Sequence, residues 1–297
     1  MTTDGTPPDA VPRAYSDGHP LDQIHYREYK LILRPACFGS ARSFAEFSKL
    51  VRHAAEQLEV ALFREDGSDN QIREVLFFDT PAFDLYNNAF ILRRRTTYQN
   101  GWPLDDHELV LKFRHPDADT AAQVDVRPAG GARYEMKFKE ELLTPRDELG
   151  GMRSLFSHNC TLEAPPPLRD RPFEDVASVF PTLRRLRIAA GTAVQLVNNL
   201  AAEEVLADLG ELHFGHGLKA KANIAIWRDR GSQNPLVGEF AFQCKFERYA
   251  ELHQKAKRRA DEFFRALQLA ARDWIQLNAT KTGVIYAMGR TPVTNRE

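Results

Sequence analysis

The chain has 297 residues, enough for one large domain or two small ones, and its 40 basic and 41 acidic side chains nearly cancel. This balance gives no overall field that favours nucleic acid or a membrane surface, and no stretch approaches the roughly 20 apolar residues of a transmembrane helix. The three cysteines, Cys37, Cys160 and Cys244, lie far apart and lack metal-ligand spacing. We therefore expect free thiols in a reducing cytoplasm.

The first half of the chain predicts strands around one early helix. Residues 1–20 are rich in Pro, Gly, Asp, Ser and Thr, which predicts a disordered tail. A strand is predicted at 24–34 and a helix at 41–62, where apolar residues recur at helical spacing and Ser43 with Glu46 forms a candidate capping box. Further strands are predicted at 70–79, 90–98, 107–115 and 132–142.

The second half begins with a stretch that lacks periodicity. Residues 143–172 contain Thr-Pro, Gly-Gly and Pro-Pro-Pro sequences, which predict an irregular crossover between two halves of a sheet. A short helix follows at 173–179, and a long helix at 250–273 has one apolar stripe. Residues 280–286 are interpreted as a last strand or a docked segment. Strands are predicted near 190–198, 204–214, 218–229 and 235–247.

About eight strands and few helices predict an α+β fold dominated by a closed antiparallel β-barrel with peripheral helices. We expect it to form a single domain over residues 21–290, followed by a tail at 291–297.

Several predicted strands alternate charged and apolar side chains with a period of two. A solvated face would explain one such strand, because antiparallel sheets commonly bury one face only. Here long cations dominate, and in a closed barrel they would converge and repel each other unless a polyanion were bound. Arginine and lysine are the usual phosphate ligands. The expected phosphate-binding residues are Arg93, Arg95, Lys112, Arg114, Lys137, Lys219, Lys221 and Lys245.

A minority of carboxylates lies among these cations. Glu28 and Glu239 are predicted on the cationic face. Carboxylates are ligands for hard cations, so we expect them to hold Mg²⁺ or Mn²⁺, which would bridge to phosphate oxygens.

Three sequence stretches resemble the signature of the CYTH, or triphosphate tunnel, superfamily. They are the turn Phe77-Phe78-Asp79-Thr80-Pro81, the strand Ile91-Leu92-Arg93-Arg94-Arg95 and the strand from Glu108 to Arg114. The resemblance spans about residues 24–247. It implies a closed antiparallel barrel whose lumen binds triphosphates and divalent metals.

This chain departs from the sequence pattern of that family at two positions. Members of the family open with Glu-x-Glu-x-Lys, where this chain has Tyr26, Glu28 and Lys30, so the first acid is replaced. Their closing strands often carry a metal-binding Glu-x-Glu, where this chain has Glu239 and Ala241. Asp208, on another strand, is the implied candidate for the missing acidic metal ligand. This chain therefore lacks two of the metal-binding acids that the resemblance implies, while the cationic phosphate-binding positions are present.

Together these patterns predict a metal-dependent phosphohydrolase, a triphosphatase, that cleaves tripolyphosphate, a nucleoside triphosphate or thiamine triphosphate, with Glu28 and Lys30 as catalytic residues. A non-catalytic polyphosphate-binding or nucleotide-binding module is the alternative that the missing acids favour. A class IV adenylate cyclase is a third, in which Tyr26 would favour a base, and a barrel with a merely solvated polar face is a fourth. The expected partner is a small triphosphate or polyphosphate, with no role for a membrane or nucleic acid.

Overall fold

The computed structural model describes residues 23–63, 70–105, 107–130, 133–163 and 171–288. The two predicted tails, 1–20 and 291–297, lie outside these ranges, so the structure does not test them. Within the described residues, no helix is both long enough and apolar enough to span a membrane.

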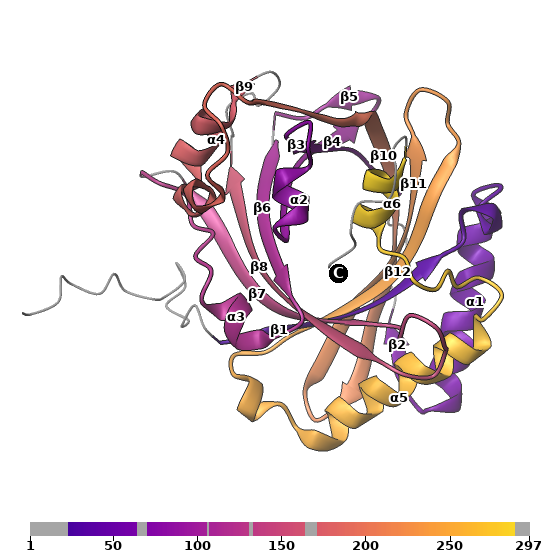
Figure 1. Cartoon of the computed structure of the whole chain (residues 1–297). Coiled ribbons are helices and arrows are strands. Elements are labelled where there is room, and N and C mark those ends of the chain that lie inside the picture. Colours follow the sequence, from indigo (N-terminus) through magenta and orange to yellow (C-terminus); the bar gives the residue numbers. More distant parts are fainter. Residues whose placement is uncertain (1–22, 64–69, 106, 131–132, 164–170, 289–297) are drawn as a thin grey trace, which may run out of the picture.

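Nine strands close into a ring among the described residues (Figure 1). Around the ring they are β11 (Leu218–Asp229), β12 (Pro235–Lys245), β1 (Tyr26–Leu33), β7 (Tyr134–Leu143), β8 (Arg153–Glu163), β6 (Glu108–His115), β4 (Phe90–Gln99), β3 (Gln71–Asp79) and β10 (Ala193–Gly215). The strand β10 pairs with β11 and closes the barrel. The pair β1–β7 is parallel, and the other eight pairings are antiparallel. The predicted closed barrel is confirmed, with nine strands in place of about eight.

Two stretches differ from their predicted structure. The strand β8 runs through the predicted irregular crossover and pairs with both β6 and β7, so it forms part of the barrel wall. The two strands predicted near 190–198 and 204–214 are one long strand, β10. Its pairing with β3 is interrupted between Leu196 and Ala201, where Asn198 and Asn199 adopt left-handed backbone angles. In the described part of both stretches, turn-favouring residues thus interrupt the periodic pattern without ending the sheet. The Pro-Pro-Pro sequence at 165–167 lies outside the described residues.

Three short strands extend the barrel wall. They are β2 (Ala61–Phe63) and β9 (Arg171–Pro172), which pair with β10, and β5 (Trp102–Pro103), which pairs with β4. Short 3₁₀ turns lie at Pro35–Cys37, Pro181–Leu186 and Tyr249–Glu251.

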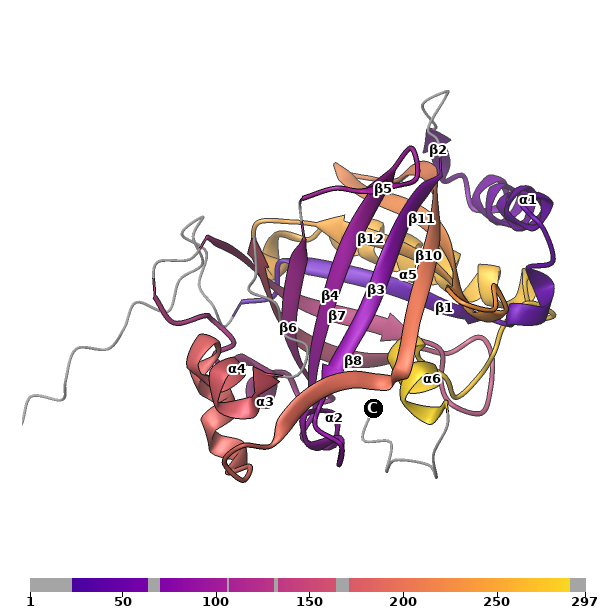
Figure 2. The same ribbon diagram turned by 90° about the horizontal axis from the view of Figure 1, so that it is seen from above.

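Helices α1 (Arg42–Gln57) and α5 (Gln254–Ala270) cover one side of the barrel (Figures 1 and 2). Ile224, from the outer face of β11, belongs to the same apolar core as Phe263 of α5. The predicted capping box on α1 is wrong, because the Ala41 cap makes no side-chain hydrogen bond and Glu46 instead pairs with Arg42 at 3.1 Å. The helix also ends earlier than predicted, and β2 follows it.

Helices α3 (Ala118–Ala122) and α4 (Phe173–Val179) cover another side of the barrel (Figure 1). Leu111 of β6 and Phe138 of β7 point outward into a core that includes Val176 of α4. Alternation therefore leaves their charged neighbours, Lys112 and Lys137, on the inner face. The expected division of these strands into an apolar outer face and a charged inner face is confirmed.

One end of the barrel is filled with apolar side chains. Helices α2 (Asp84–Asn87) and α6 (Lys281–Ala287) lie at this end, away from β2 and β5 (Figure 2). The predicted docked segment is therefore a helix. The ring of Tyr286 in α6 stacks on the ring of Tyr86 in α2, with the ring centres 4.0 Å apart. Tyr286 also donates a hydrogen bond to Asp79, which accepts others from the backbone N–H groups of Leu85 and Tyr86.

Candidate functional site

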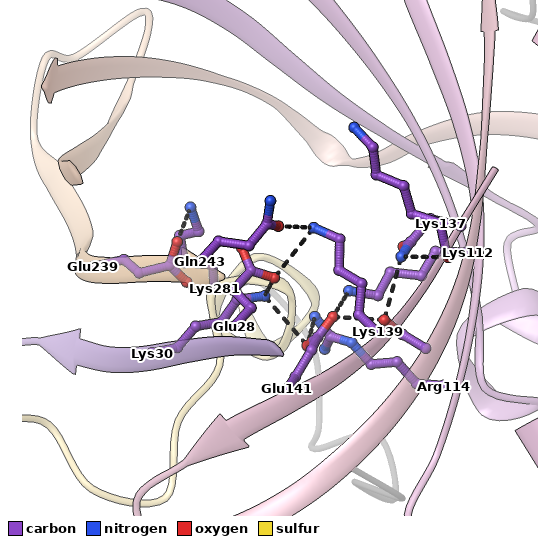
Figure 3. A network of polar contacts seen from close by, with 12 residues as sticks. Glu28, Lys30, Lys112, Arg114, Lys137, Lys139, Glu141, Glu239, Gln243 and Lys281 are labelled. Carbon is purple, nitrogen blue, oxygen red and sulfur yellow. Dashed lines mark hydrogen bonds and ion pairs between the residues drawn. The ribbon is translucent and has the colours of Figure 1, made fainter. Parts of the chain in front are cut away.

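The inner face of the barrel encloses a cavity of about 240 Å³ lined mostly by charged side chains (Figure 3). Eight cationic side chains face four acidic ones. The cations are Lys30, Arg93, Arg95, Lys112, Arg114, Lys137, Lys139 and Lys281, and the acids are Glu28, Glu108, Glu135 and Glu239. Five of the eight predicted phosphate-binding residues line this cavity. The lining side chains therefore carry more positive than negative charge, which attracts anions.

A buried carboxylate next to the cavity lining, Glu141, contacts three of the lining cations. It lies 3.2 Å from Lys30 and 3.4 Å from Arg114, it accepts a hydrogen bond from Lys112, and the Ser157 hydroxyl donates to it at 2.8 Å. Burial alone would raise the pKa of Glu141, but Arg114, Lys112 and Lys30 outweigh burial and hold it well below the ordinary value. Glu141 was not predicted as a site residue, although this side chain continues the alternation of Lys137 and Lys139.

Glu28 lies directly across the parallel strand pair from Glu141, and Lys30 joins the two acids. The Lys30 ammonium is 3.0 Å from Glu28 and 3.2 Å from Glu141, and Lys139 approaches Glu28 at 3.4 Å. Although burial opposes ionisation, Lys139 and Lys30 hold the pKa of Glu28 below its ordinary value. Glu28 is therefore an ionised carboxylate with ammonium neighbours.

Arg93 is a guanidinium in the cavity for which the described residues provide no ion pair and no hydrogen-bond partner at Nε. Burial and repulsion from Arg95 lower the pKa of Arg93 to about 9. The acidic group that acts most strongly on Arg93 is Glu204, which pairs with Arg73 at 2.7 Å and lies 4.0 Å from Arg95. Sequence reasoning did not single out Glu204 or Arg73, which lie on β10 and β3.

The last helix contributes a cation that the sequence analysis also missed. The Lys281 ammonium lies 2.6 Å from Glu239, 3.4 Å from Glu204 and 4.6 Å from the centre of the Trp227 ring. Thr280 caps this helix, since its hydroxyl accepts a hydrogen bond from the Gly283 N–H at 3.0 Å. The cap thus positions Lys281 at the boundary between the charged cavity and the apolar end.

Four predicted site residues lie outside the cavity lining. Lys219, Lys221 and Lys245 are exposed. Lys221 pairs across strands with Gln243, which in turn pairs with Glu28. Lys221 therefore lies on the inner face of the barrel but outside the cavity lining. Asp208 is also exposed, accepts a hydrogen bond from the Gly210 N–H at 2.8 Å, and is not brought together with Glu28 or Glu239.

The predicted Mg²⁺ or Mn²⁺ ligands do not form a common donor set. Glu239 pairs in register with Ile32, four residues along β1 from Glu28, so the two acids are separated. Lys30 lies between Glu28 and Glu141, and Lys281 contacts Glu239. Within the described ranges, no group of three or more His, Cys, Asp or Glu residues is arranged to hold a metal ion. The side chains as placed therefore do not fit a resident divalent cation, because ammonium groups already contact the acids.

The chain matches no family model and no curated protein. Among solved structures it is similar to HpAC1 from Hippeastrum, an adenylyl cyclase candidate described as having a dominant triphosphatase activity. The identity is 14%, the TM-score is 0.44, and the match covers 91% of this chain and 98% of that chain.

Two further similar structures are adenylate cyclase candidates. The one from Bacillus halodurans is 11% identical with a TM-score of 0.37, over 88% of this chain and 96% of that chain. The one from Vibrio parahaemolyticus is 12% identical with a TM-score of 0.36, over 89% of this chain and 100% of that chain.

Proposed function

We propose that this protein binds a short phosphate chain in the barrel cavity, either tripolyphosphate or the triphosphate end of a nucleotide or of thiamine triphosphate. The observation that carries the proposal is the cation surplus of the cavity, and above all Arg93, a guanidinium without an ion pair among the described residues. A phosphate oxygen would supply the missing acceptor, and a guanidinium presents forked donors that match it.

The size of the cavity supports a compact ligand. Its volume of about 240 Å³ is smaller than the about 300–1,000 Å³ typical of sites for drug-sized molecules. A phosphate chain would occupy the cavity, and any organic part of the ligand would extend beyond it.

The test is isothermal titration calorimetry with tripolyphosphate. Losing one charge-assisted hydrogen bond costs about 1.5–3 kcal/mol, so Arg93→Gln is expected to weaken binding by about tenfold or more. The matched control is Arg258→Gln on the outer helix α5, where the arginine is 69% exposed and pairs only loosely with Glu262. An absence of binding to the wild-type protein, or equal affinity in Arg93→Gln, would contradict the proposal.

A second candidate function is hydrolysis of the terminal phosphoanhydride. It is favoured by Glu28, an ionised carboxylate on the wall of the cavity next to Lys30. The surrounding cations would stabilise the negative charge that gathers on the phosphate oxygens in the transition state. In this proposal Mg²⁺ or Mn²⁺ would enter as part of the substrate, already bound to the phosphate chain.

Phosphate release from tripolyphosphate, measured with Mg²⁺ or Mn²⁺ and with EDTA, separates the two functions. If the protein is a hydrolase, Glu28→Gln should lower kcat by about a hundredfold or more while tripolyphosphate still binds. Glu262→Gln on the outer helix is the control. A wild-type protein that binds tripolyphosphate but releases no phosphate with either metal would be a binding module.

A further inference from the structure

A tyrosine next to the cavity is flanked by lysines on both neighbouring strands. Tyr26 opens β1, and it pairs in register with Lys245 of β12 and with Lys139 of β7. Lys137 lies two residues from Lys139 on the same face of β7. The register thus places one cation on each side of the aromatic ring, and a third cation two residues away along β7.

All three ammonium groups approach the same ring. The Nζ atoms lie 5.7 Å from its centre for Lys137, 5.6 Å for Lys139 and 5.8 Å for Lys245. These distances are within the about 6 Å at which a ring quadrupole attracts a cation. Tyr26 is only 7% exposed, so its faces are not open for stacking on a base, contrary to the role that a cyclase would give it.

The positive charge of this cluster is only partly neutralised. Lys137 pairs with Glu135 at 2.9 Å, and Lys139 shares Glu28 with Lys30. Lys245 is exposed and has no ion pair among the residues that the structure describes. An aromatic ring attracts ammonium groups without cancelling their charge. Tyr26 therefore brings the three ammonium groups together without removing their positive charge, as a carboxylate at this position would do.

The cluster adjoins the cavity and reaches solvent. Lys137 and Lys139 line the cavity, and their side chains are 30% and 15% exposed, while Lys245 lies outside the lining. Figure 3 shows Lys137 and Lys139 on the same side of the network as Gln243, to which Lys139 donates a hydrogen bond at 2.6 Å. A group bound between these ammonium groups would contact both the cavity and the surrounding water.

We propose that Tyr26 organises Lys137, Lys139 and Lys245 into a metal-independent binding site for one phosphate group at the mouth of the cavity. This inference rests on the proposed function, because it locates the outer end of the same phosphate chain. A phosphate group carries about −1.5 to −2 charges at neutral pH and has three oxygens that accept hydrogen bonds. It matches three converging ammonium donors, and these donors require no divalent cation to attract it.

The test is calorimetry with tripolyphosphate in buffer that contains EDTA. Tyr26→Leu removes the ring, and Lys245→Gln removes an exposed cation with little risk to folding. Each is expected to weaken binding by roughly five- to tenfold. Tyr26→Phe keeps the aromatic face and should bind like the wild-type protein. Thermal melting checks that each variant is folded.

The outcomes separate this inference from the proposed function. If the wild-type protein does not bind tripolyphosphate at all, both fail. If Arg93→Gln weakens binding but Lys245→Gln and folded Tyr26→Leu bind normally, only the outer site is overturned. If tripolyphosphate binding disappears in EDTA and returns with Mg²⁺, the proposal that the outer site is metal-independent is overturned. Selective weakening in Tyr26→Leu and Lys245→Gln, with Tyr26→Phe unaffected, supports it.

Discussion

The Lys281 ammonium lies 2.6 Å from the Glu239 carboxylate and joins the last helix to the barrel wall. Both side chains are largely buried, at 14% and 10% exposure, and Lys281 also lies 3.4 Å from Glu204. A cation from the end of the chain thus occupies the position next to Glu239 that a metal ion would need. Glu239 consequently acts in the structure as a partner for Lys281.

Glu239→Gln is expected to raise the affinity for tripolyphosphate. The variant removes a negative charge from the cavity and leaves Lys281 paired with Glu204 alone among the described acids, so binding should gain about 1 kcal/mol or roughly fivefold. Thermal melting checks that the variant is folded. Calorimetry measures it, with Asp208→Asn as a control that changes an exposed acid outside the cavity. A lower affinity in Glu239→Gln that appears only with Mg²⁺ would instead identify Glu239 as a ligand of a bound cation.

Glu141→Gln should destabilise the fold strongly. Lys30, Lys112 and Arg114 would lose a carboxylate that is 1% exposed, and breaking such a buried ion pair typically costs about 3–5 kcal/mol. Urea unfolding measures the free energy. The control Glu46→Gln, in an exposed pair on α1, should change it by less than about 0.5 kcal/mol. Equal stability of the two variants would show that the three cations do not depend on Glu141.

Acid should weaken the protein through the same carboxylates. The pKa values of Glu28 and Glu141 are lower in the folded state than the ordinary value of 4.5. Their stabilising contribution is therefore complete above pH 4.5 and is lost as the pH falls from there through the lowered values. Melting temperatures recorded from pH 7 to pH 3 should be level at first and then fall. Glu141→Gln should reduce the slope of that fall, and an unchanged slope would exclude Glu141 as its source.

Tyr286→Phe should cost about 1 kcal/mol of unfolding free energy, the usual net value of one hydrogen bond. The phenylalanine keeps the stack on Tyr86 but removes the hydroxyl that donates to Asp79 at 3.0 Å. Asp79→Ala should cost more, because the backbone N–H groups of Leu85 and Tyr86 would also lose their acceptor. Chemical denaturation compares the variants, and an Asp79→Ala no less stable than Tyr286→Phe would show that these backbone bonds are not needed.

The alternation of residues along single strands predicted which side chains face the interior. Lys112 and Lys137 line the cavity, and their neighbours Leu111 and Phe138 pack outward, because side chains of a strand point alternately to its two faces. The pattern does not give the position along the barrel axis. Lys221 therefore has the predicted face but lies beyond the cavity.

The acids were harder to predict because their partners come from distant strands. Glu141 lies beside Glu28 through the parallel pairing of β1 with β7, and strand order is not visible in a single sequence. Glu204 lies on β10, which continues across Asn198 and Asn199, whereas two separate strands were predicted near 190–198 and 204–214. Lys281 reaches the cavity because residues 281–287 form a docked helix, which their composition did not distinguish from a strand.

The apolar end of the barrel limits how a ligand of the proposed function would reach the cavity. Ile285 and Tyr286 of α6 pack there with Phe77, Trp227 and Val237 of the wall and fill the space between them. In the proposed function, a phosphate chain would therefore enter and leave the cavity on the side away from α6, and would not pass through this apolar end. A departing product and an arriving ligand would then share one route into the cavity and would exclude each other. For a hydrolase, this predicts that released phosphate competes directly with its own precursor.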